Sequence, residues 1–98
     1  MGFFNAMSSI GKINDLLKET EYQLKIVGDM TDNSVSTPRV QQEVEGLIRL
    51  YNQIGNLLEK SSGARTAVYT FLGRKCRSWE ILSFLDETIR GLKKYGDI

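Results

Sequence analysis

The feature that most constrains this chain is a run of apolar residues at heptad spacing near its start. One heptad position holds Phe3, Ile10, Leu17 and Leu24, and the partner position holds Ala6, Ile13, Thr20 and Val27. Steps of three and four residues place both sets along one side of an α-helix. The pattern predicts an amphipathic helix over about residues 3–28, ended by Gly28 and followed by a polar loop.

A second seam follows this loop. It consists of Val40, Val44, Leu47, Tyr51, Ile54 and Leu58. Thr37 before Pro38 is a good helix start, because a threonine side chain accepts from free amides and a proline at the first helical position loses no hydrogen bond. We expect a helix over about residues 38–60. Ile48, Leu50 and Leu57 widen its apolar stripe, which predicts contact with two neighbouring helices.

The third seam is interrupted. Its heptad phase is carried by Ala64, Val68, Phe71, Leu82, Leu85, Ile89 and Leu92. Between Gly73 and Ser78 the apolar residues fall out of phase, so two interpretations remain: one helix over about 64–95 with a local distortion at 73–78, or a break near Gly73 with a restart at Ser78. We favour the single helix, because short apolar pieces form poor independent helices.

Together the three seams predict an all-α fold, an antiparallel three-helix bundle with coiled-coil-like heptads. Ser61, Ser62 and Gly63 form a turn of the length that joins antiparallel neighbours. A chain of 98 residues fits a single helical domain spanning 1–98. Its apolar stretches are far shorter than the ~20 residues that cross a bilayer, so we expect no membrane-spanning segment.

The composition argues against catalysis. The chain contains no histidine, the commonest general base and metal ligand, and no Gly-rich phosphate-binding loop. Cys76 is flanked by cations that favour a thiolate, but it lies on the apolar stripe, where core packing is the simpler interpretation. We therefore expect no enzymatic activity, no metal, no cofactor and no small-molecule substrate.

One local feature departs from an ordinary bundle. Residues 60–77 hold five cations and no acid, although the whole chain has a net charge of +1. A solvated helix face is the simpler explanation, and contact with phosphates or with an acidic partner is the functional one. The candidate partner-binding or anion-binding residues are Arg65, Arg74, Lys75, Arg77 and Trp79.

These observations predict a small non-enzymatic protein that acts through protein–protein interaction or self-assembly, as a homodimer or with another helical protein. The alternative is a nucleic-acid-binding regulator that uses the basic 60–77 region. The first segment of the chain, counted from its start through Asp32, has three lysines against five acids, which argues against a membrane surface. A single cysteine and the lack of a signal peptide point to the cytoplasm.

Overall fold

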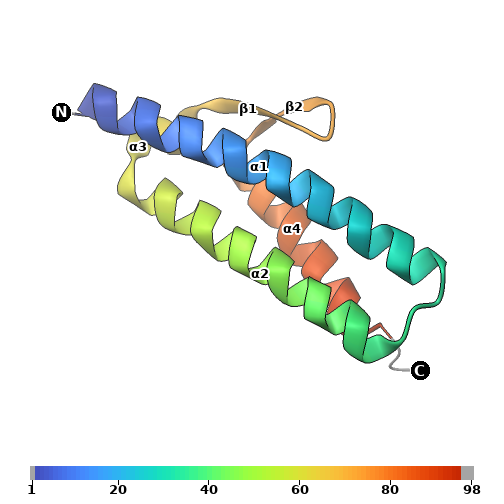
Figure 1. The fold of residues 1–98 in the computed structure, drawn as a ribbon. Coiled ribbons are helices and arrows are strands. Elements are labelled where there is room, and N and C mark those ends of the chain that lie inside the picture. The colour runs from blue at the N-terminus through green and yellow to red at the C-terminus, as the bar shows by residue number, and fades with distance from the viewer. Residues whose placement is uncertain (1, 96–98) are drawn as a thin grey trace.

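Three long helices and one small hairpin form the protein (Figure 1). The computed structural model describes residues 2–95, with side chains from residue 8 onward. In chain order the elements are α1 (Gly2–Asp32), α2 (Thr37–Lys60), α3 (Ser62–Thr66), β1 (Val68–Phe71), β2 (Arg74–Arg77) and α4 (Ser78–Lys93). Phe3 and Ala6 of the first predicted seam lie outside the described side chains.

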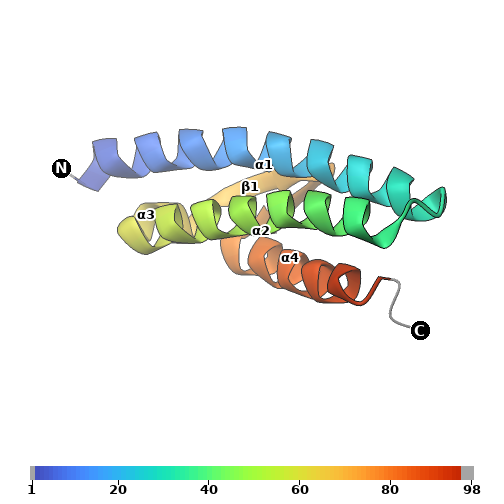
Figure 2. The same cartoon turned by 60° about the horizontal axis from the view of Figure 1, so that its bottom comes forward.

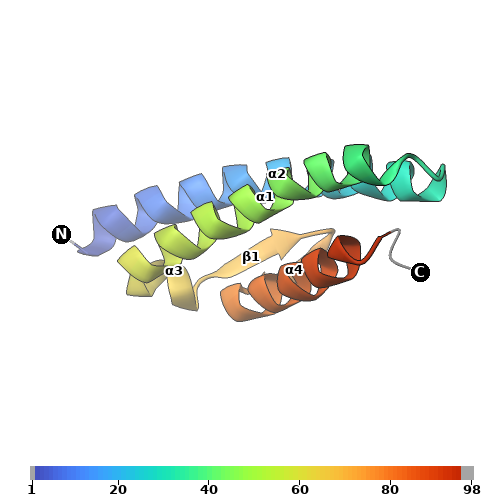
Figure 3. The same ribbon diagram turned by 90° about the horizontal axis from the view of Figure 1, so that it is seen from below.

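The long helices pack together as the heptad seams predict. α2 runs back along α1, and α4 packs against the other side of α2 (Figure 2). The widened stripe of α2 therefore does contact two neighbours, as predicted. Viewed from below, α1 and α2 form one layer, and α4 lies with the hairpin in a second layer (Figure 3).

The core follows the predicted phases closely. One cluster, toward the α3 end, is built on Ile13, Leu17, Ile54, Leu58, Ala64, Tyr69, Phe71, Ile81 and Leu85. The other, toward the opposite end, is built on Val27, Val40, Val44, Leu47 and Ile89. Thr20 is also fully buried, and its hydroxyl donates to the Leu16 carbonyl at 2.7 Å, which satisfies the one polar group that the first seam carries.

The first helix is longer than predicted. It continues past Gly28 to Asp32, and the left-handed residue that ends it is Ser34, with a φ of 54°. The Val35 amide donates to the Met30 carbonyl at 3.0 Å and the Ser34 amide to the Thr31 carbonyl at 3.2 Å. These two bonds make a Schellman ending, which satisfies the last carbonyls of the helix without a glycine.

The prediction of one helix over 64–95 is wrong between Ala67 and Arg77. Val68, which the heptad phase places inside, is 53% exposed, whereas its neighbour Tyr69 is 2% exposed. Burial there alternates with a period of two, as in a strand with one buried face. The alternative interpretation, a restart at Ser78 with that serine as the cap, agrees with where α4 begins. The cap itself is Arg77, and Ser78 is the first helical residue.

Candidate functional site

The hairpin is closed by a tight two-residue turn. Leu72 has a φ of 53° and Gly73 a φ of 76°, and two successive positive φ angles define the turn whose twist matches paired strands. The strands pair antiparallel, with Val68 opposite Arg77 and Phe71 opposite Arg74. Glycine adopts such a φ freely, but leucine does so at a steric cost of about 1–2 kcal/mol.

The buried face of the hairpin fills the space between the helices. Tyr69 and Phe71 point into the core, and the Tyr69 hydroxyl donates to the Ala64 carbonyl at 2.6 Å. Cys76, opposite Tyr69, is half-buried and packs against the same core cluster. The hairpin is therefore a structural part of the bundle on one face, and its other face is available to solvent.

Two of the five predicted site residues hold helix ends. The Arg65 guanidinium donates from Nη1 to the carbonyls of Leu58 and Glu59, at 2.9 and 3.1 Å, and so caps the end of α2. Arg77 donates from Nη1 to the Thr66 carbonyl at the end of α3. These contacts give both arginines a folding role that their charge alone did not reveal.

Arg74 and Lys75 are different. Both are exposed on β2 at the tip of the hairpin. Among the side chains from residue 8 to 95, the one ion pair joins Arg90 and Asp86, so no carboxylate in this part of the chain neutralises either tip cation. They are the two predicted residues whose charge the described fold does not use.

Trp79 lies elsewhere. It is 69% exposed and borders the groove between α2 and α4, together with Tyr51, Leu82 and Arg65. The tip cations instead line the cleft on the hairpin side of α4. The structure thus separates the five predicted residues into a tip pair, Arg74 and Lys75, a distant pair, Arg65 and Trp79, and Arg77 at the base of the hairpin.

A small cleft of about 230 Å³ lies between the hairpin tip and α4. We call it the tip cleft and define it by its lining residues Phe71, Leu72, Arg74, Lys75, Cys76, Glu80, Ile81 and Phe84. Phe84 is 43% exposed and meets Phe71 edge to face, with ring centres 5.9 Å apart. Leu72 is 47% exposed, so two large apolar side chains flank the two unneutralised cations.

The tip is tied to α1 by one hydrogen bond that sequence reasoning missed. Glu21 Oε2 accepts from the Leu72 amide at 2.9 Å. A carboxylate accepting from a backbone amide makes a charge-assisted bond, which fixes the position of the turn. Neither Glu21 nor Phe84 carried a signal in the sequence, because each acquires its role only when the hairpin folds over α1 and α4.

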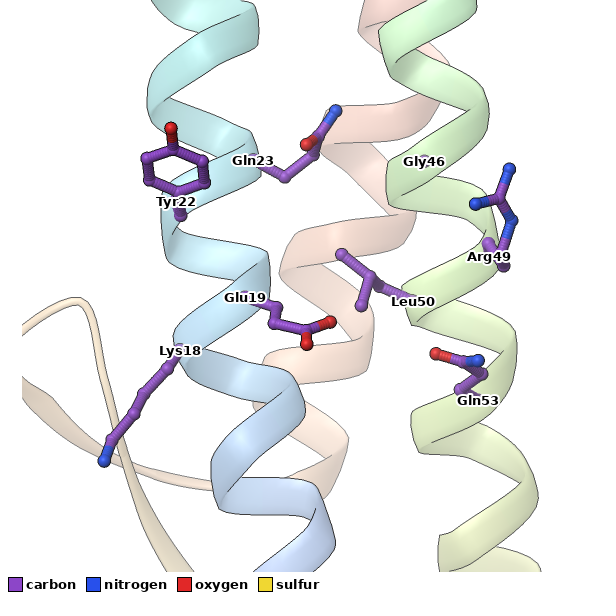
Figure 4. A pocket seen from close by; sticks show the side chains of 8 residues that line it. All are labelled: Lys18, Glu19, Tyr22, Gln23, Gly46, Arg49, Leu50 and Gln53. Atoms are coloured by element: carbon purple, nitrogen blue, oxygen red, sulfur yellow. The ribbon is translucent and has the colours of Figure 1, made fainter.

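A second groove runs along the outer side of α1 and α2 (Figure 4). Gln23 crosses it toward α2 and donates from Nε2 to the carbonyl and carboxylate oxygens of Glu43, at 2.9 and 2.7 Å. It approaches α2 beside Gly46, where an added Cβ would lie 3.1 Å from Gln23 Nε2. Leu50 forms the buried part of the lining, and the charged residues at its rim are mixed in sign, with Lys18 and Glu19 on α1 and Arg49 on α2, which suits a solvated helix surface.

The described part of the chain brings together no cluster of side chains that could hold a metal ion. No helix within residues 2–95 is both long and apolar enough to span a membrane. Comparison of the chain with family models, with curated proteins and with solved structures finds no match. The tip cleft is the candidate functional site because it brings two cations outside any ion pair beside two exposed apolar side chains.

Proposed function

We propose that this protein is a non-enzymatic interaction protein, and that it holds an acidic segment of a protein partner at the tip cleft. The observation that carries the proposal is Leu72. It adopts a left-handed backbone that favours glycine or asparagine, and 47% of its apolar side chain is exposed. An apolar side chain held exposed on a strained backbone is expected where a contact with another molecule needs it.

The charge of the tip supports the same proposal. Leu72 lies next to Arg74 and Lys75, and Phe84 adds an exposed aromatic ring across the cleft. The two carboxylates beside the tip are engaged by backbone amides, Glu21 by that of Leu72 and Glu80 by that of Arg77. An apolar centre with cations at its side suits a peptide that carries both carboxylates and apolar side chains. Arginine and aromatic residues are also the types that most often dominate protein interfaces.

Nucleic acid binding is the weaker candidate. Arg65 and Arg77 are engaged by carbonyls at helix ends, and Trp79 lies on the other flank of α4. A surface that tracks a phosphate backbone needs free cations spread along one face. Lys60 lies apart from the tip at the end of α2, so the cations of residues 60–77 that carbonyls do not hold do not form one continuous track. Duplex DNA nevertheless belongs in the binding experiment as a competitor.

The test uses fluorescence anisotropy with a labelled peptide of glutamate and valine in scrambled order, at low salt. We expect binding to weaken at least about tenfold when Arg74→Ala is combined with Lys75→Ala. The matched control is Arg39→Ala with Lys93→Ala, which also removes one exposed arginine and one exposed lysine but acts where α2 begins and α4 ends, away from the tip cleft. Equal loss in both variants, or stronger binding of duplex DNA than of the peptide, would contradict the proposal.

Self-assembly into a homodimer stays a prediction from the seams. Light scattering at high micromolar concentration measures it directly, and a monomer mass there would rule it out. We also propose the cytoplasm as the compartment, because the chain has one cysteine and hence no intramolecular disulfide to maintain.

A further inference from the structure

We propose that the partner segment binds in an extended conformation along the free edge of β2, as a third strand of the hairpin sheet. This inference rests on the proposed function and specifies its binding mode. Recognition by strand addition takes affinity from backbone hydrogen bonds and specificity from alternate side chains. The edge, its backbone groups and its charge each support the assignment.

The hairpin sheet has two edges, one along β1 and one along β2. β1 packs beside α1, and the Leu72 amide at its end is taken by Glu21. β2 pairs with β1 on one side, and its cations Arg74, Lys75 and Arg77 are all exposed. The other side of β2 is the edge at which a new strand would add, and because Glu80 of α4 takes the Arg77 amide there, the pairing would be centred on Lys75.

The backbone groups of Lys75 and Arg77 point away from β1, toward the edge of the sheet. In an antiparallel pair, alternate residues turn their amide and carbonyl toward the partner strand and away from it. The Arg77 amide donates to Glu80 Oε1 at 2.8 Å, so Arg77 faces away from β1. Lys75, two residues earlier, faces the same way, and no hydrogen bond within the described residues uses its amide or its carbonyl.

The side chains of β2 indicate which residues an added strand would carry on each of its faces. Lys75 and Arg77 share the outer face of the hairpin with Thr70 and Val68, so residues beside them on a new strand would be acidic. The opposite face of that strand would point toward the tip cleft and Phe84, which suits apolar side chains. The segment that fits is short, extended and alternates acidic with apolar residues.

The same charges argue against a second copy of this chain as the occupant. Cations on an edge strand are a common protection against edge-to-edge pairing, because two identical basic edges repel each other. A basic edge rejects its own copy and accepts an acidic strand. Charge complementarity therefore selects the partner segment over self-pairing at this edge.

The experiment compares backbone-modified peptides with the wild-type protein. The probe is a short blocked peptide that alternates glutamate and valine, measured by fluorescence anisotropy. Two versions are N-methylated, one on every glutamate and one on every valine. Only alternate amides of an added strand face β2, so we expect one version to lose at least about tenfold in affinity and the other to bind nearly as the unmodified peptide.

Two protein variants separate the backbone donor from the charge. Lys75→Ala removes the cation and keeps the amide, whereas Lys75→Pro removes both, and the ladder with β1 does not use that amide. We expect Lys75→Ala to weaken binding several-fold and Lys75→Pro to weaken it about fivefold further. Circular dichroism checks the fold of each, and the peptide series remains decisive if the proline variant unfolds.

The outcomes distinguish the two proposals. Equal binding by both N-methylated peptides, or equal binding by the alternating and scrambled peptides, overturns strand addition while the acidic-partner proposal stands. Failure of every acidic peptide to bind overturns both. Competition by duplex DNA that is stronger than competition by unlabelled peptide assigns the tip to nucleic acid instead.

Discussion

Replacing Tyr69 with phenylalanine tests how the hairpin is joined to the helices. The Tyr69 side chain is 2% exposed, and its hydroxyl donates at 2.6 Å to the carbonyl of Ala64, which is itself fully buried. Tyr69→Phe keeps the ring and therefore leaves no large cavity. It removes one hydrogen bond and leaves the Ala64 carbonyl without that donor in a site closed to water.

The magnitude follows from that geometry. A hydrogen bond contributes ~1 kcal/mol net, and a buried acceptor left without a partner costs ~1–3 kcal/mol, so we expect a loss of about 2 kcal/mol in the free energy of unfolding. For a domain of this size that loss lowers Tm by roughly 8–16 °C. Urea denaturation followed by circular dichroism measures the free energy directly.

Tyr95→Phe is the matched control. The Tyr95 hydroxyl donates to the Val35 carbonyl at 2.7 Å, but Tyr95 is only half-buried, so water replaces the lost donor. We expect a cost below ~0.5 kcal/mol there. Equal costs for the two substitutions would refute the argument that burial of the Ala64 carbonyl sets the difference.

The same residue predicts a pH dependence. Burial raises the pKa of the Tyr69 hydroxyl above its ordinary value of 10.0. The folded state thus favours the neutral phenol, and its contribution is fully present below pH 10.0 and is lost as the pH rises toward the folded pKa. Tyr69→Phe should show a shallower alkaline decline than the wild type, and an identical decline would contradict this assignment.

Three further substitutions test other contacts. Thr20→Val should raise the free energy of unfolding, measured in urea, by ~0.5–1 kcal/mol, because an apolar methyl replaces a buried hydroxyl and the Leu16 carbonyl keeps its helical amide donor. A destabilised variant would show that the Thr20 hydroxyl itself stabilises the fold. Leu72→Asn should raise Tm by relieving the left-handed backbone strain, worth about 1 kcal/mol, and should weaken peptide binding at the tip cleft. A lower Tm would mean that the Leu72 side chain contributes more packing energy than its exposure implies. Glu21→Ala should speed hydrogen exchange of the Leu72 amide roughly fivefold, since the loss of one bond is worth ~1 kcal/mol; unchanged exchange would contradict the tether.

The first two helices could be predicted because only a helical period fits the spacing of their apolar residues. In α2 every position of the predicted seam is buried or packs against a core cluster, and no competing period fits. The hairpin could not be separated from a drifting helix, because Ala64 before it, Phe71 within it and Leu85 after it all satisfy the heptad phase. The alternation of Tyr69 with Thr70 and Phe71 was the available signal, but Leu72-Gly73 lacks the Asn or Asp that usually marks such a turn.

The candidate site was predicted only in part. The sequence locates the positive charge at Arg74 and Lys75, but it does not reveal that Arg65 and Arg77 serve carbonyls at helix ends. That distinction depends on where α2 and α3 end in space. Phe84 joins the tip cleft through a tertiary contact with Phe71, which no local spacing encodes.

The base of the hairpin has a consequence for how this protein could change. The chain leaves the helical framework at Arg65 and rejoins it at Ser78, and the Ser78 hydroxyl donates to the Arg65 carbonyl at 2.8 Å. The segment between them is an insert with a fixed entrance and exit, and doubling the length of a flexible loop costs only ~0.6 kcal/mol. If Tyr69 and Phe71 are retained, the turn is free to lengthen or to accept grafted recognition sequences, which makes the three helices a scaffold on which new binding specificities can be built.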